Sequence, residues 1–87
     1  MEITEIKVFP TRDDGRLKAY ATVVFDNCFI IRDLKVIEGH KGLFVSMPSE
    51  LGKNDRWYER VRCLNQGVKE LIESKVLDAY QAQESNF

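Results

Sequence analysis

The feature that most constrains this chain is a run with an apolar residue at every second position, followed directly by a turn and by a second apolar run. Apolar side chains occupy every second position from Leu17 to Phe25, which is the period of a β-strand with one buried face. Asp26 and Asn27 follow, and both residue types tolerate the left-handed conformation of a tight turn. Residues 28–37 then return as a second apolar run. The chain is therefore expected to fold around a long antiparallel hairpin.

A further strand is predicted before this hairpin. Residues 3–8 have strand composition, and the strand should end at Pro10, which cannot donate a hydrogen bond to a ladder. Residues 11–15 have the composition of a turn, with Gly15 free to adopt a positive φ. In the return strand, residues 29–31 are apolar on both faces, which is typical of a central strand or of one covered by a partner.

The segment after the hairpin is less regular. Residues 38–42 predict a second turn, because they contain two glycines. Residues 43–47 predict a short strand that Pro48 ends. Residues 49–56 show no apolar period, so we expect a polar loop there. Residues 57–64 are expected to form a last, twisted strand.

A single C-terminal helix completes the predicted fold. Asn65 is a favourable N-cap, and the helix should fray from Gln81 onward. Its apolar stripe follows the helical spacing i, i+3, i+4 and consists of Val68, Leu71, Ile72, Val76, Ala79 and Tyr80. The predicted class is α+β: a twisted antiparallel sheet of four to five strands with one C-terminal helix. We expect one domain over residues 1–82 and a flexible tail over residues 83–87.

The length of the chain suggests that a partner completes the fold. A chain of 87 residues buries a thin core, and one helix covers only one face of a sheet. Long apolar strand edges invite pairing with another chain. We therefore expect a homodimer that forms through the sheet.

Several classes of function are unlikely on composition and motifs. The sequence contains no catalytic Ser–His arrangement, no phosphate-binding loop and no dinucleotide fingerprint, so we predict that it is not an enzyme and needs no cofactor. His40 is expected to be a solvated loop residue, and Cys63 a packed structural one. With Cys28 as the second cysteine, there is no C-x-x-C spacing and no metal site, which favours a reduced, cytoplasmic protein. We see no signal peptide, and no apolar run suits membrane insertion.

The most informative stretch is residues 53–62, where cations alternate with aromatic residues. Cations pair with phosphates, and aromatic rings stack on exposed bases. If the stretch is extended, Arg56, Tyr58, Arg60 and Arg62 share one face, opposite Trp57 and Glu59. Two interpretations remain open: a nucleic-acid contact strip, or a solvated edge strand whose arginines pair with Glu50, Asp55 and Glu59. The candidate contact residues are Lys53, Arg56, Trp57, Tyr58, Arg60 and Arg62.

Three stretches of the chain resemble the stage V sporulation protein G (SpoVG) family. They are Gly-Arg-Leu-Lys-Ala at residues 15–19, Phe-Ile-Ile-Arg-Asp-Leu-Lys-Val-Ile-Glu-Gly at 29–39, and Gly-Leu-Phe-Val-Ser-Met-Pro-Ser at 42–49. The resemblance covers about residues 1–80. It implies a small bacterial cytoplasmic protein that dimerises through a twisted sheet, acts in septation, sporulation and gene regulation, and binds DNA and RNA.

The resemblance also implies where nucleic acid would bind. In this family the basic residues lie after the Met-Pro-Ser string and in the segment that leads to the helix. Here Glu50 and Leu51 stand where a Lys-Arg pair is usual, and residues 53–55 replace the usual Pro-Asp-Gly turn. Our leading hypothesis is a DNA-binding homodimer, with RNA as a second ligand and with the cations of residues 53–62 replacing the missing pair. The alternative is an adaptor for a protein of the division or envelope machinery that binds by strand addition.

Overall fold

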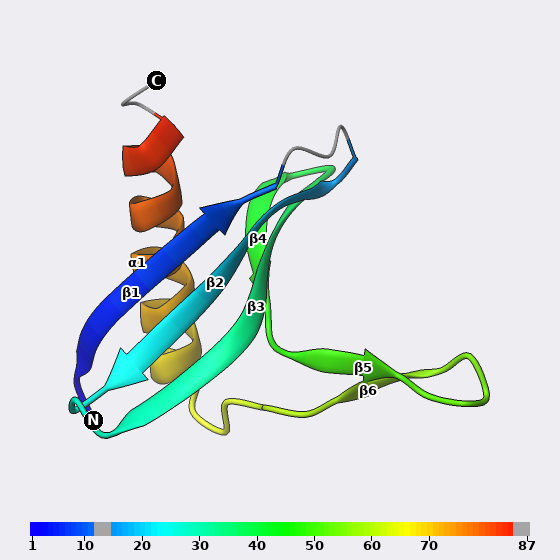
Figure 1. Ribbon diagram of the computed structural model, residues 1–87, viewed down its shortest axis with the longest axis horizontal. Coiled ribbons are helices and arrows are strands. Elements are labelled where there is room, and N and C mark those ends of the chain that lie inside the picture. Colours follow the sequence, from blue (N-terminus) through cyan, green and yellow to red (C-terminus); the bar gives the residue numbers. More distant parts are fainter. Residues whose placement is uncertain (12–14, 85–87) are drawn as a thin grey trace.

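The structure is a computed structural model, and it describes residues 1–11 and 15–84. These residues form a four-stranded antiparallel sheet in the order β1-β2-β3-β4, a separate two-stranded hairpin, and one helix (Figure 1). The elements are β1 (Ile3–Pro10), β2 (Leu17–Phe25), β3 (Phe29–Gly39), β4 (Gly42–Ser46), β5 (Ser49–Leu51), β6 (Trp57–Glu59) and α1 (Gln66–Glu84). The predicted α+β class, with one sheet and one C-terminal helix, is confirmed.

The core lies between one face of the four-stranded sheet and α1. The helix packs against β1, β2 and β4 and leaves the opposite face of the sheet uncovered (Figure 1). We call the helix-covered face the inner face and the uncovered one the outer face. The buried core residues are Val8, Ala19, Ala21, Val23, Phe25, Leu34, Val36, Val45, Ile72, Val76 and Tyr80. Alternation in β2 therefore buries the residues that the period of two predicts.

The turn between β2 and β3 has the predicted chemistry. Asp26 and Asn27 both adopt a positive φ, of 51° and 53°. The start of the chain supports this turn, because the Asp26 amide donates to the carbonyl of Glu2, just before β1, at 2.8 Å and the Asn27 amide donates to Thr4 Oγ1, in β1, at 3.0 Å. The β2–β3 hairpin is thus fixed at its turn by a third strand.

A bulge in β3 interrupts the alternation of that strand. Ala21 pairs with Leu34 and Val23 pairs with Ile31, so two residues of β3 lie opposite Thr22. Asp33 takes up the extra length with a φ of 65°. As a result, Ile31 and Leu34 both point to the inner face, although they are three positions apart.

The helix begins as predicted but ends later. The Val68 amide donates to Asn65 Oδ1 at 3.2 Å, which confirms Asn65 as the N-cap. The expected fraying from Gln81 is wrong up to Glu84, because Gln83 Nε2 donates to the Val8 carbonyl at 3.1 Å and fixes the last turn to β1. The predicted tail at residues 85–87 lies outside the described residues, and the domain boundary at residue 82 stays a prediction.

One residue of the predicted apolar stripe is wrongly placed. Leu71 is 40% exposed, whereas Leu77, which we did not include, packs against the core. Both leucines satisfy the helical spacing, and the angle at which α1 crosses the sheet decides between them. No helix in the described part of the chain has the length and apolar character needed to cross a membrane.

Two predictions for the segment after β4 are wrong. Residues 49–56 are not simply a loop, because Ser49–Leu51 form β5. Residues 57–64 are not one strand, since β6 ends at Glu59. The three-residue strands pair only with each other, and their hairpin extends away from the main sheet (Figure 1).

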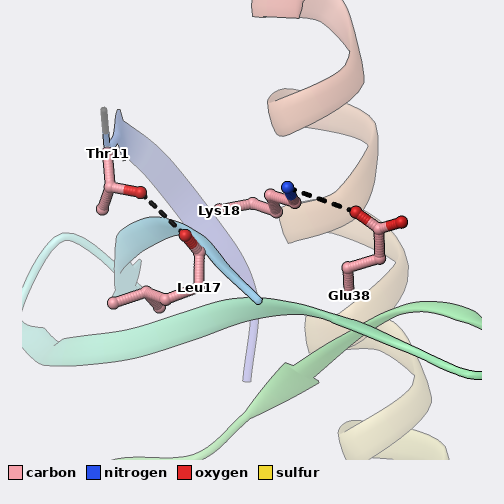
Figure 2. A network of polar contacts seen from close by, with 4 residues as sticks. All are labelled: Thr11, Leu17, Lys18 and Glu38. Carbon is pink, nitrogen blue, oxygen red and sulfur yellow. Dashed lines mark hydrogen bonds and ion pairs between the residues drawn. The ribbon is translucent and has the colours of Figure 1, made fainter. Parts of the chain in front are cut away.

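Polar contacts join the neighbouring strands at the end of the main sheet opposite the β2–β3 turn. Figure 2 shows Thr11 Oγ1 donating to the Leu17 carbonyl at 2.8 Å and Lys18 Nζ at 3.3 Å from Glu38 Oε2. The ion pair joins β2 to β3 where a second register shift separates Leu17 from Ala19. The remainder of the predicted turn at residues 11–15 lies outside the described residues.

Leu34→Ala should lower the free energy of unfolding by about 3 kcal/mol, because it empties a fully buried site between the sheet and the helix. Urea unfolding at one fixed protein concentration measures the loss. Leu71→Ala removes the same atoms from an exposed site and serves as the matched control. Equal stability of the two variants would contradict the assignment of the core.

Asn65→Ala should lower the free energy of unfolding by about 1 kcal/mol, because the first turn of α1 loses a capping acceptor. Asn65→Asp retains a side-chain acceptor and should unfold like the unmodified chain or at a higher urea concentration. An unchanged midpoint for Asn65→Ala would show that the cap contributes nothing to stability.

Candidate nucleic-acid interface

The predicted contact residues lie on and beside the β5–β6 hairpin, which we call the arm (residues 48–60). Its strands are held by the Gly52 amide donating to the Arg56 carbonyl at 2.7 Å and the Arg60 amide donating to the Pro48 carbonyl at 2.9 Å. Asp55 turns the chain at the tip with a φ of 60°. A short two-stranded hairpin is only marginally stable in isolation, so its side chains must help to hold it.

Tyr58 is one of these stabilising side chains. Its ring lies against the backbone of Gly52 so closely that a Cβ at position 52 would collide with it. Its hydroxyl lies 3.0 Å from Asn54 Nδ2, which donates to it. One face of the Tyr58 ring is therefore covered by the arm, and the ring fixes the turn at the tip.

Trp57 is presented to solvent. Its side chain is 62% exposed and pairs across the arm with Leu51. Lys35 Nζ, from β3, lies 5.1 Å from the centre of the indole ring, within the range of a cation–π contact. This contact connects the arm to the main sheet.

The four cations of the predicted strip fall into two groups. Lys53 and Arg56 lie at the tip, are exposed, and form no ion pair within the described residues. Arg60 and Arg62 are paired: Arg60 Nη2 lies 2.7 Å from Glu50 Oε2, and Arg62 Nη2 lies 2.7 Å from Glu59 Oε2. All four side chains of these two pairs are largely exposed.

The prediction that Arg56, Tyr58, Arg60 and Arg62 share one strand face is wrong beyond Glu59. The period of two ends with β6, and Arg62 reaches back three residues to Glu59, which we expected on the opposite face. The alternative interpretation is confirmed for Glu50 and Glu59, each of which pairs with an arginine, but not for Asp55, which forms no ion pair with the described residues. The structure thus brings the six predicted residues to one region but not onto one flat strip.

Sequence reasoning missed Lys35 as part of this region. Its neighbours Leu34 and Val36 are fully buried, so the side chain of Lys35 must point to the outer face. The signal available in the sequence was the position of Lys35 between the apolar residues Leu34 and Val36. Its contact with Trp57 depends on where the arm leaves the sheet, which the strand pattern does not indicate.

His40 and Cys63, which we considered as catalytic residues, lie in the surroundings that the sequence predicted. His40 is exposed in the turn between β3 and β4, as expected. Cys63 is partly buried against the core, as expected, and Cys28 is exposed. Within residues 1–11 and 15–84, no group of three or more His, Cys, Asp or Glu side chains is arranged to hold a metal ion.

A second surface feature lies beside the N-terminal half of β3. β4 pairs with β3 only from Lys35 to Gly39, so the edge of Phe29–Ile31 has no strand partner among the described residues. Next to this edge is an apolar groove of about 360 Å³. It is lined by Met1, Phe25, Phe29, Ile31, Leu64, Val68 and Ile72, among other residues. Phe29 is 59% exposed and Leu64 is 95% exposed.

Comparison with known proteins gives one consistent result. The family model described as SpoVG matches residues 1–82. The chain is 47% identical over 83 residues to the "Putative septation protein SpoVG" of Bdellovibrio bacteriovorus, covering 95% of this chain and 76% of that one. It is 43% identical to the protein of the same name from Archaeoglobus fulgidus, covering 95% of this chain and 98% of that one.

A more distant relative extends the range. The protein of that name from Caldicellulosiruptor saccharolyticus is 34% identical over 82 residues, which is 94% of this chain and 93% of that one. The SpoVG family consists of non-enzymatic septation and regulatory proteins, and this confirms the prediction that the chain is not an enzyme. The match over residues 1–82 and these identities show that the chain belongs to the SpoVG family.

Proposed function

We propose that the chain is a homodimeric regulator of septation and gene expression that binds DNA, with RNA as a second ligand. The observation that carries the proposal is the tip of the arm. Lys53 and Arg56 extend there without a carboxylate partner among residues 1–11 and 15–84, next to an indole ring that is 62% exposed. Two free cations beside an open aromatic face suit phosphates and a base edge or an unstacked base.

Arg60 and Arg62 form a second set of contacts that nucleic acid can recruit. Exposed ion pairs contribute at most about 1 kcal/mol, so a phosphate can displace Glu50 or Glu59 at little cost. The carboxylates also lower the attraction of the arm for phosphates in general. From Glu50 to Arg62 the arm region has four cations and three carboxylates. Binding should therefore require the right placement of phosphates and not charge alone.

The dimer would form along the open edge of β3. The unpaired backbone of residues 29–31 can pair with the same segment of a second copy, and a two-fold axis makes such an antiparallel contact self-complementary. The adjoining groove would bury Phe29 and Leu64, which are exposed in the single chain. Once one arm of the dimer has bound a nucleic acid, the second arm would be held close to the same molecule. The overall affinity of the dimer would therefore exceed that of a single arm.

The open edge also supports the alternative function. A protein of the division or envelope machinery can add a strand to an unpaired edge, and the acidic residues of the arm fit this role as well. Light scattering and nucleic-acid titration separate the two functions. A monomer that retains no DNA or RNA at low salt would favour the adaptor.

The double variant Lys53→Ala/Arg56→Ala should bind duplex DNA more weakly and with a flatter salt dependence. Loss of two phosphate contacts lowers the slope of log K against log salt by about 2 in magnitude. Fluorescence anisotropy at several salt concentrations measures this slope. The double variant Glu50→Gln/Glu59→Gln tests the opposite change. Loss of the two carboxylates frees Arg60 and Arg62 from their ion pairs and should strengthen DNA binding. An unchanged slope in the first variant would remove the arm tip from the interface.

Phe29→Glu should convert the dimer into a monomer at micromolar concentration, because a two-fold contact would bring two carboxylates together in an apolar groove. Light scattering gives the mass directly. Leu71→Glu places the same charge on an exposed position of α1 and should remain dimeric. A monomer mass for the unmodified chain would refute the proposed pairing.

A further inference from the structure

The outer face of the main sheet presents a row of side chains that leads to Trp57 of the arm. Phe9 of β1 pairs with Tyr20 of β2, Tyr20 pairs with Lys35 of β3, and Lys35 contacts the Trp57 ring. Residues paired across neighbouring strands share a face and have Cβ atoms on the order of 5 Å apart. We call Phe9, Tyr20, Lys35 and Trp57 the outer row.

The orientation of the outer row is fixed by the core. Val8, Ala19, Ala21, Leu34 and Val36 are buried on the inner face, so the residues between them must point outward. Phe9 is 54% exposed and Tyr20 is 39% exposed. The helix packs on the opposite face of the sheet and leaves the outer face uncovered (Figure 1). The molecule thus presents aromatic rings to solvent on a rigid support.

The charges around the outer row favour an anionic ligand. Lys35 lies within the row, and Lys7 lies in the neighbouring row of the same face, since Lys7 pairs with Thr22. Arg32, beside the bulge, is exposed and forms no ion pair in the described part of the chain. Two carboxylates lie near them: Glu5, whose Oε1 is 3.5 Å from Lys7 Nζ, and the exposed Asp33, which follows Arg32 in the bulge. A second copy stacked on this face would bring like charges together, whereas a phosphate backbone would neutralise them.

We propose that the outer row is a stacking platform for single-stranded nucleic acid. A base inside a duplex has both of its faces covered, so rings on a flat sheet can stack only on unpaired bases. The lysine in the row would hold a phosphate between stacked bases. The row ends at Trp57, so a single strand would continue from the sheet onto the arm. This inference rests on the proposed nucleic-acid binding and adds to it a preferred form of ligand and a second contact surface.

The test compares Phe9→Ala, Tyr20→Ala and Tyr20→Phe, with Leu71→Ala as an apolar control outside the outer face. The probes are a fluorescent 12-nucleotide RNA without self-complementarity and a DNA duplex of 12 base pairs. Each of the first two variants should bind the RNA about tenfold more weakly, because a stacking ring is lost. Tyr20→Phe keeps the ring and should bind like the unmodified chain, as should Leu71→Ala. Duplex binding should change little in all four variants.

The outcomes separate this inference from the proposed function. If Phe9→Ala and Tyr20→Ala bind the RNA normally while Lys53→Ala/Arg56→Ala does not, the platform is refuted and the arm remains. If the unmodified chain retains neither probe, both proposals fail. If Tyr20→Ala instead lowers the mass found by light scattering, the face is a contact between copies, which also refutes the platform. Photocrosslinking of an RNA with 5-iodouridine should place adducts on Phe9 or Tyr20, and adducts confined to the arm, Trp57 included, would contradict the proposal.

Discussion

The pairing of β2 with β3 is the constraint on which the rest of the structure depends. It joins the two longest strands, places six core side chains of β2 and β3 on the inner face with no exposed area or almost none, and leaves their neighbours on the outer face. β1 extends the pair on one side, and its Thr4 supports the turn together with Glu2, which precedes the strand. β4 extends it on the other side, but only along half of β3. Both the open edge and the uncovered face follow from this arrangement.

The arm differs from the main sheet in what stabilises it. The sheet is held by burial, since its inner face excludes water against α1. The arm has exposed residues along most of its length and is held by backbone hydrogen bonds, by the Tyr58 ring on Gly52, and by two exposed ion pairs. Such contacts are individually weak and can be exchanged for contacts with a ligand. An arm whose contacts can be exchanged is thus attached to a sheet whose contacts are buried.

Much of the fold could be predicted because it follows from local chemistry. One local structure is favoured at each of three places: a strand at residues 17–25, a tight turn at Asp26 and a helix N-cap at Asn65. The arm could not be predicted, because a three-residue strand has no period and its register depends on the contact of Tyr58 with Gly52. The site residues were predicted as a group, and their pairing with Glu50 and Glu59 was one of two interpretations, but which arginine pairs with which carboxylate was not predicted. Whether Arg62 meets Glu59 depends on where β6 ends, and strand alternation gives no sign of that end.

The bulge at Asp33 gives the two halves of β3 separate roles. The downstream half is fixed by the core through Leu34 and Val36, whereas the upstream half borders the groove and the open edge. The bulge places one extra residue between Ile31 and Leu34, which share the inner face at a spacing of three; loss of that residue would leave them two positions apart and still on the same face. A change of chain length by a single residue at the bulge is therefore a route by which descendants of this chain can alter the bend and twist of this edge without rebuilding their interior.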